Sequence, residues 1–194
     1  HPEEQVPVVV LAFTRLHAGG KFDKKSGQAA YAFSGGLHGV GVSVTNALST
    51  RVEVEVRRDG HAHFVSFSEN GEQVSELQLG EACGRQTGTR VRAWPDAKYF
   101  ESAKLPLAEL ERLLCSKAVL LPGLTVTLQS EQGGGAKTWR YPLGLQGYLE
   151  EAGAGTEAVS PVYTGEKFAA ADDETFAEGE GAVWALGWFA EQVC

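Results

Sequence analysis

The residues of this chain best suited to bind a ligand are glycines that stand directly before an apolar segment. Residues 35–41 read GGLHGVG, and Lys21 follows two further glycines upstream. Glycines just before a helix let the backbone approach a ligand and leave free N–H groups aimed at it. The start of a helix also carries positive partial charge, so this arrangement is typical of an anion site, most often one for phosphate.

The order of the glycines excludes the two commonest phosphate-binding loops. A P-loop has a lysine directly after its last glycine, and no lysine follows Gly41. A Rossmann turn reads Gly-x-Gly-x-x-Gly after a strand, whereas here the order is reversed, with glycines at 36, 39 and 41. Spacing by itself therefore leaves open a glycine turn that binds no ligand.

Other residues that could do chemistry form weaker patterns. His61 and His63 would share one face of a strand, but no third metal ligand is evident, so we expect no metal site in this chain. The three cysteines (Cys83, Cys115 and Cys194) are odd in number and far apart. They indicate reduced thiols rather than disulfides.

The residue pattern around these candidates predicts strands that pair through hairpins and are interrupted by helices. Val52, Val54 and Val56 alternate with charged residues, which indicates a half-buried strand over 51–58. Further strands are predicted over 62–68, after the turn at Asp59-Gly60, near 74–79, over 89–94 and over 124–129. A buried helix is predicted over 40–48 and an amphipathic helix over 105–121. This pattern predicts an α+β sandwich with helices on one face of the sheet.

Two stretches are predicted to lack regular structure. Residues 18–36 have little periodicity and are predicted to form a mobile loop, and residues 153–182 are rich in Gly, Ala, Glu and Asp, as in a linker.

Residues 183–189 (VWALGWF) then predict a buried strand that begins another domain without its partners. For residues 6–17, periodicity alone cannot decide between helix and strand.

Bulk composition is typical of a cytoplasmic globular domain. The 194 residues contain 43% hydrophobic residues and carry a net charge of −8, and no apolar run approaches membrane-spanning length. The acidity argues against a broad DNA-binding face, because nucleic-acid affinity depends largely on Lys and Arg. The chain begins with His1 and not with Met, which indicates an internal fragment.

The wider sequence resembles the B subunits of bacterial type IIA topoisomerases. The resemblance is carried by HPEE at 1–4, LHAGGKF at 16–22, SGGLHGVGVSVTNALS at 34–49, RRDG at 57–60, TGT at 87–89 and WPD at 94–96. It is close over about the first 145 residues and loose beyond them. KAVL at 117–120 followed by Pro122-Gly123 favours the topoisomerase IV type (ParE) over the gyrase type. The resemblance also favours a helix over 6–17.

The resemblance implies a fold and a domain organisation. The fold is a two-layer α+β sandwich of the GHKL (Bergerat) ATPase type, with a mixed, mainly antiparallel sheet, helices on one face and its N-terminal part missing. Residues 1–152 would form the ATPase domain, 153–182 a linker, and 183–194 the start of a transducer domain. The parent enzyme would use ATP and Mg²⁺ to drive DNA strand passage.

The resemblance also implies which residues contact ATP. Backbone groups of Gly36, Leu37, His38, Gly39, Val40, Gly41 and Val42 would hold the phosphates. Lys21 would reach them from a lid, Tyr31 would contact the nucleoside, Thr89 would lie near the adenine, and Arg58 would form a rim that contacts coumarin-type inhibitors. Without this context, Lys21 would be a solvated lysine, Arg58 a surface arginine and Thr89 only a strand former.

The catalytic groups are expected outside the chain. The adenine-binding aspartate, the Mg²⁺ asparagine and the glutamate general base would lie upstream of His1, so no catalytic residue is assigned here. Implied partners are a ParC-like A-type subunit and DNA, both through the full-length protein, and a second ATPase domain on nucleotide binding, with no membrane. The alternatives are a gyrase B domain, a non-catalytic nucleotide- or inhibitor-binding module, or another ATPase of the same superfamily.

Overall fold

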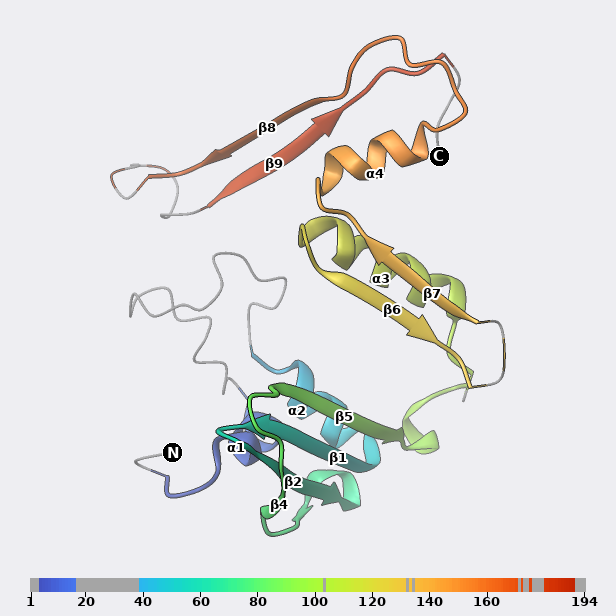
Figure 1. Cartoon of the computed structure of the whole chain (residues 1–194). Helices are drawn as coiled ribbons and strands as arrows, with labels where there is room; N and C mark the ends of the chain where they lie inside the picture. Colours follow the sequence, from blue (N-terminus) through green and yellow to red (C-terminus); the bar gives the residue numbers. More distant parts are fainter. Residues whose placement is uncertain are drawn as a thin grey trace. The chain divides into compact units, whose positions relative to one another are not determined.

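The structure, a computed structural model, divides the chain into two compact units, His1–Ala103 and Lys104–Cys194 (Figure 1). It describes residues 4–16, 39–102, 104–131, 133, 135–170, 172, 175 and 180–190. No helix in this described part of the chain is both long and apolar enough to cross a membrane.

The first unit is a five-stranded antiparallel sheet with two helices on one face (Figure 1). The strand order is β3-β2-β1-β5, and β4 also pairs with β2. The elements are α1 (Val8–Thr14), α2 (Gly41–Ala47), β1 (Ser49–Arg58), β2 (His61–Ser68), η3 (Glu69–Gly71), β3 (Gln73–Val74), β4 (Gln78–Ala82), β5 (Gly88–Pro95) and η4 (Ala97–Tyr99). The predicted helix within 6–17, the hairpin at Asp59-Gly60 and the strand over 89–94 are confirmed.

The core of this unit lies between the helices and the alternate residues of the sheet. Val52 and Val54 of β1 are 0% and 2% exposed, and they stand opposite Phe67 and Val65 of β2. Phe13 of α1 stacks on Phe67 with 5.4 Å between the ring centroids. The alternation of β1 is confirmed, because successive side chains of a strand point to opposite faces and only one face meets the helices.

Helix α2 is buried through its polar residues, so the prediction of a buried apolar helix over 40–48 is wrong in this respect. Val42 and Val44 are 45% and 42% exposed, whereas Ser43 and Asn46 are 7% and 2% exposed. Asn46 donates from Nδ2 to the carbonyl oxygen of Phe13 at 3.0 Å. The apolar residues of 40–48 (VGVSVTNAL) do not recur with a helical period, so they could not show which face of α2 would be covered.

The second unit contains two separate antiparallel hairpins and two helices. Its elements are α3 (Leu107–Leu120), β6 (Thr125–Gln129), β7 (Ala136–Arg140), α4 (Leu145–Ala152), β8 (Tyr163–Phe168) and β9 (Gly181–Leu186). Trp139 and Tyr141 pack with Ala118 and Val119 of α3. The predicted helix within 105–121 and strand within 124–129 are confirmed, whereas β7 and α4 had not been predicted.

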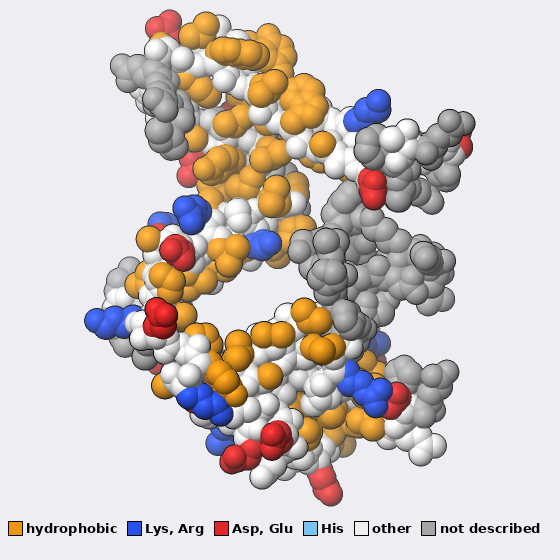
Figure 2. Space-filling model, turned by 180° about the vertical axis from the view of Figure 1, so that it is seen from behind, with side chains coloured by type: hydrophobic (Ala, Val, Ile, Leu, Met, Phe, Trp, Pro, Cys, Tyr) orange, Lys and Arg blue, Asp and Glu red, His pale blue; other side chains and the backbone are white. Residues whose placement is uncertain are grey.

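The last hairpin corrects the prediction for the C-terminal segment. The predicted linker over 153–182 contains β8, and β8 pairs with β9, so the strand near 183 has a partner. Nor is that strand buried, since Val183, Trp184 and Leu186 are 54%, 45% and 53% exposed. Figure 2 shows hydrophobic side chains gathered over this part of the molecule. The domain boundaries at 152 and 182 stay predictions.

Candidate functional site

The structure describes six of the eleven predicted site residues. These are Gly39, Val40, Gly41, Val42, Arg58 and Thr89, and all six belong to the first unit. Lys21, Tyr31, Gly36, Leu37 and His38 lie outside the described residues. The geometry of the site is therefore that of the α2 start and of the β1 and β5 strands.

The turn into α2 requires glycine at one position. Gly39 has φ +59°, a left-handed conformation that costs other L-residues roughly 1–2 kcal/mol. Val40 follows with φ −113° and ψ −9°, and the helix begins at Gly41. A Cβ built on Gly41 would meet no described atom within 4 Å. Among the described residues, therefore, nothing blocks a close approach to the backbone at the start of α2.

The first N–H groups of α2 are not capped by a side chain in the described part of the chain. The nearby hydroxyls donate to carbonyl groups instead: Ser43 Oγ to Val40 at 3.0 Å and Thr45 Oγ1 to Gly41 at 3.0 Å. The first N–H groups of any α-helix lack an intrahelical acceptor, and they carry the positive end of the helix dipole. This helix start can thus donate to an anion such as phosphate.

Thr89 lies on the sheet face that carries the core. It stands opposite Val56 of β1, two residues before Val91, which stands opposite the buried Val54. Thr89 is exposed and Val91 is 46% exposed, so the core does not cover this end of the face. The hydroxyl of Thr89 can both donate and accept a hydrogen bond, and Val91 offers an apolar wall beside it.

Val91 is a further candidate for the site, and the sequence did not single it out. Its signal was its position two residues after Thr89, because alternate residues of a strand share a face. A valine in a predicted strand is most simply explained as part of the core, and only its exposure in the structure distinguishes Val91 from Val54.

Arg58 ends β1 on the same face as Val56 and Thr89. It stands opposite His61, and its side chain is 77% exposed. Its Nε lies 3.5 Å from Asp59 Oδ2, a contact between two exposed groups that holds the guanidinium weakly. Arg58 is therefore available at the rim of this face.

The C-terminal end of α2 is anchored by the WPD motif, which the sequence analysis had used only as a marker of resemblance. The backbone N–H of Asp96 donates to the carbonyl oxygen of Leu48 at 2.9 Å. Asn70 donates from Nδ2 to Ser49 O and to Asp96 Oδ2, both at 3.2 Å, and Lys98 Nζ donates to Asn70 Oδ1 at 2.8 Å. The motif thus holds α2 against the sheet.

Hydrogen bonds and charge within this anchor shift two pKa values. The backbone N–H and then the side chain of Lys98 lower the pKa of Asp96, with Asn70 contributing less. The hydrogen bond to Asp96 and that to Tyr99 raise the pKa of Lys98. Both shifts favour the charged forms, so the pair stays ionised at neutral pH and keeps its structural role.

The described residues include no group of three or more His, Cys, Asp or Glu side chains that could hold a metal ion. His61 and His63 lie on the same face of β2, opposite Arg58 and Val56. They have no third ligand among the described residues.

The chain is similar in sequence to the B subunits of two kinds of bacterial topoisomerase. It is 47% identical over 192 residues to the B subunit of DNA topoisomerase 4 of Salmonella typhimurium and 46% identical to that of Escherichia coli. Each alignment covers 98% of this chain and 29% of the relative, so the chain spans less than a third of these relatives. The B subunit of DNA gyrase of Micrococcus luteus is 47% identical over 132 residues, which cover 68% of this chain and 18% of that relative.

The structure is also similar to solved structures. The ATP-binding domain of topoisomerase IV of Francisella tularensis, solved with a small-molecule inhibitor, matches with a TM-score of 0.62 and 36% identity. That match covers 82% of this chain and 41% of the other. The 43K ATPase domain of Thermus thermophilus gyrase B, solved with an aminocoumarin, matches with a TM-score of 0.67 and 28% identity over 88% and 41% of the two chains. No protein-family model matches the chain.

Proposed function

Since this chain is homologous over nearly its whole length to a part of the B subunits of bacterial type IIA topoisomerases, we propose that it belongs to the ATP-binding domain of a topoisomerase IV B subunit. The observation that carries this proposal is the identity of 46–47% over 98% of the chain. The likeness to ATP-binding domains at TM-scores of 0.62 and 0.67 also confirms the predicted α+β fold of the GHKL ATPase type.

The geometry supports a division of labour between two parts of the site. The uncapped start of α2 donates backbone N–H groups to the phosphates, and the left-handed Gly39 shapes the turn in front of it. Thr89 and Val91 lie on the core-bearing face of β5 and form one wall for the base. Lys21, Tyr31, Gly36, Leu37 and His38 stay predicted contacts of the nucleotide.

Mg²⁺ does not find a ligand set among the described residues. None of the described residues is assigned as a Mg²⁺ ligand or as the base that would activate water. In this proposal, parts of the protein outside this chain supply both the metal ligand and the base. The contribution of this chain is to bind and orient the triphosphate through the α2 start.

The activity of the whole protein forms part of the same proposal. ATP binding and hydrolysis would drive DNA strand passage in the cytoplasm, together with a ParC-like A-type subunit and a second copy of the ATPase domain. Arg58, 77% exposed at the rim, would contact coumarin-type inhibitors. The complex of the gyrase B ATPase domain with an aminocoumarin supports an inhibitor site in this fold.

The gyrase B alternative is the weaker one. The alignments to topoisomerase IV subunits of Salmonella typhimurium and Escherichia coli extend over 98% of the chain, whereas those to gyrase B of Micrococcus luteus and Haloferax volcanii extend over 68% and 77%. Decatenation of linked DNA circles by the full-length protein with its A-type subunit tests the topoisomerase IV assignment.

The nucleotide site is tested by calorimetric titration of a non-hydrolysable ATP analogue into the full-length protein. Thr89→Val keeps the branched shape of the side chain and removes its hydroxyl. A neutral hydrogen bond contributes about 0.5–1.5 kcal/mol, so the variant should bind roughly 2- to 13-fold more weakly. Thr125→Val, an exposed strand position in the second unit, is the matched control. If the wild-type protein binds no analogue, the assignment is wrong.

A further inference from the structure

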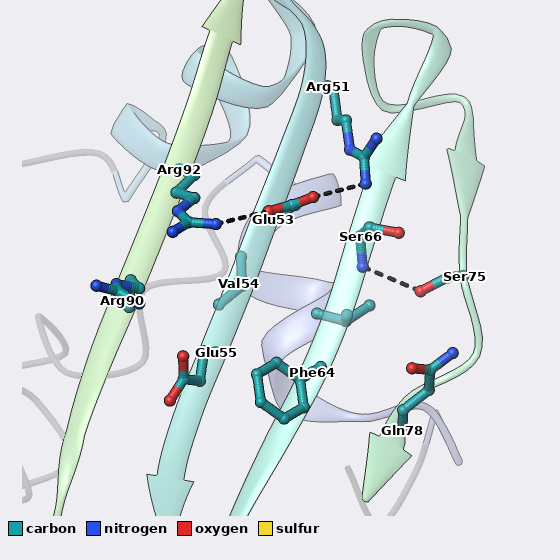
Figure 3. A pocket seen from close by; sticks show the side chains of 11 residues that line it. Arg51, Glu53, Val54, Glu55, Phe64, Ser66, Ser75, Gln78, Arg90 and Arg92 are labelled. Carbon is teal, nitrogen blue, oxygen red and sulfur yellow. Dashed lines mark hydrogen bonds and ion pairs between the residues drawn. The ribbon is translucent and has the colours of Figure 1, made fainter. Parts of the chain in front are cut away.

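The face of the first unit's sheet that points away from α1 and α2 carries a groove that the nucleotide site does not use. On this face Glu53 and Glu55 of β1 stand opposite Arg92 and Arg90 of β5. Figure 3 shows these side chains in front of the strands, with the helices behind. The groove has a volume of about 410 Å³, and Phe64, Ser66, Ser75 and Gln78 line its other side.

Positive charge exceeds negative charge on this face. Glu53 receives Arg51 at 2.6 Å and Arg92 at 3.6 Å, from opposite sides (Figure 3). The carboxylate of Glu55 is paired with Arg57 at 2.8 Å. Four guanidinium groups on β1 and β5, counting Arg90, therefore share two carboxylates, on a chain whose net charge is −8.

Of these four arginines, Arg90 has no carboxylate partner among the described residues. It lines the groove and stands opposite Glu55. Glu55, whose side chain is only 15% exposed, is already held by Arg57. Arg92 is only loosely engaged, because its distance of 3.6 Å to Glu53 exceeds that of a charge-assisted hydrogen bond.

The spacing of these two arginines fits an extended polypeptide. Arg90 and Arg92 are two residues apart on one strand face, a separation of about 6.8 Å. Side chains at alternate positions of an extended peptide have the same spacing, so two carboxylates of such a peptide match the two guanidinium groups. The opposite wall offers neutral hydrogen-bonding groups and the ring of Phe64, which is 39% exposed.

Nucleic acid fits the groove less well. A phosphate backbone laid along β5 would bring its charges close to Glu53 and Glu55, which line the middle of the groove. Like charges at such distances repel. A peptide can place carboxylates over the arginines and neutral or basic groups over the glutamates.

We propose that this groove binds an extended acidic segment of a partner protein, with carboxylates at alternate positions held by Arg90 and Arg92. The groove lies on the opposite face of the sheet from Thr89, so binding there would be a function separate from nucleotide binding. Binding of this kind weakens as salt is added, because the charges on both sides are exposed.

The test uses the full-length protein and a short fluorescein-labelled peptide in which glutamate alternates with threonine. Fluorescence anisotropy at low ionic strength should show saturable binding, and the same peptide with glutamine for glutamate should not bind. Arg90→Gln should weaken the glutamate peptide roughly 5- to 10-fold, because it removes one charged hydrogen-bonding partner. Arg90 has no ion pair in the described chain, so its replacement leaves the fold intact.

Arg85→Gln is the matched control, since it removes the same charge from an exposed turn outside the groove. It should leave peptide affinity unchanged, and both variants should bind the ATP analogue like the wild type. Absence of saturable binding, equal binding of the glutamine peptide, or equal affinity of Arg90→Gln and wild type would each overturn the proposal. Arg90-dependent binding of a labelled DNA duplex in place of the peptide would overturn it too. A failure of nucleotide binding alone would leave it standing.

Discussion

Replacing Gly41 with alanine should separate the stability of the fold from the binding of nucleotide. Gly41 is the first residue of α2, and a Cβ added there would meet no described atom within 4 Å. Alanine is favoured over glycine inside helices by up to about 1 kcal/mol. Gly41→Ala should therefore fold at least as stably as the wild type, which chemical denaturation of the full-length protein measures.

Nucleotide affinity should fall in the same variant. If phosphate approaches the backbone at the start of α2, the added methyl group would stand where the ligand must come close. Losing one hydrogen bond to a charged group costs roughly 1.5–3 kcal/mol. Since 1.4 kcal/mol is a factor of ten, the ATP analogue should bind about 10- to 100-fold more weakly in a calorimetric titration.

Two further glycines make the experiment specific. Gly147→Ala changes a glycine within α4, where the new Cβ makes ordinary contacts of 3.5 Å and 4.0 Å, and it should leave nucleotide affinity unchanged. Gly39→Ala forces a left-handed φ of +59° on alanine and should cost roughly 1–2 kcal/mol of stability as well. Wild-type nucleotide affinity in Gly41→Ala would refute the reasoning that the α2 start holds the phosphates.

Three predictions concern the scaffold and are measured by urea unfolding. Asn46→Ala leaves the carbonyl oxygen of Phe13 without its 3.0 Å donor and should destabilise the fold by about 1 kcal/mol. This is the low end of the cost of a lost buried hydrogen bond, because the variant also removes Asn46 Oδ1, which is buried without a partner among the described residues. Gly71→Ala should destabilise the fold more than Gly84→Ala. Both glycines have positive φ, but only at Gly71 would the new Cβ lie 2.6 Å from Asn46 Nδ2. Equal losses in the free energy of unfolding would contradict this packing. Hydrogen bonds lower the folded-state pKa of Asp96 below 3.8, so its contribution is present above the unfolded-state pKa and is lost as pH falls through the folded-state value. Asp96→Asn should therefore lose less stability on acidification than the wild type, and an unchanged pH dependence would assign the effect to other carboxylates.

The parts of the molecule that depend on local physics were predictable from the amino-acid pattern. Alternation of Val52, Val54 and Val56 with charged residues determined a half-buried strand, and Asp59-Gly60 determined the turn after it. These predictions hold because strand alternation and turn conformation are properties of neighbouring residues. The glycines before α2 were recognised for the same reason, and the longer motifs identified the family.

Which surfaces these elements present could be seen only after the chain had been folded. The tertiary structure showed that α2 buries Ser43 and Asn46 and exposes its valines, that β8 is the partner of β9, and that the WPD motif anchors α2. Strand register also places Arg90 and Arg92 of β5 beside Glu55 and Glu53 of β1, which lie 35 and 39 positions earlier in the chain. Burial and ion pairing of a side chain depend on which residues pack against its helix or strand. Those residues are distant in the sequence, and only strand register and helix packing bring them close.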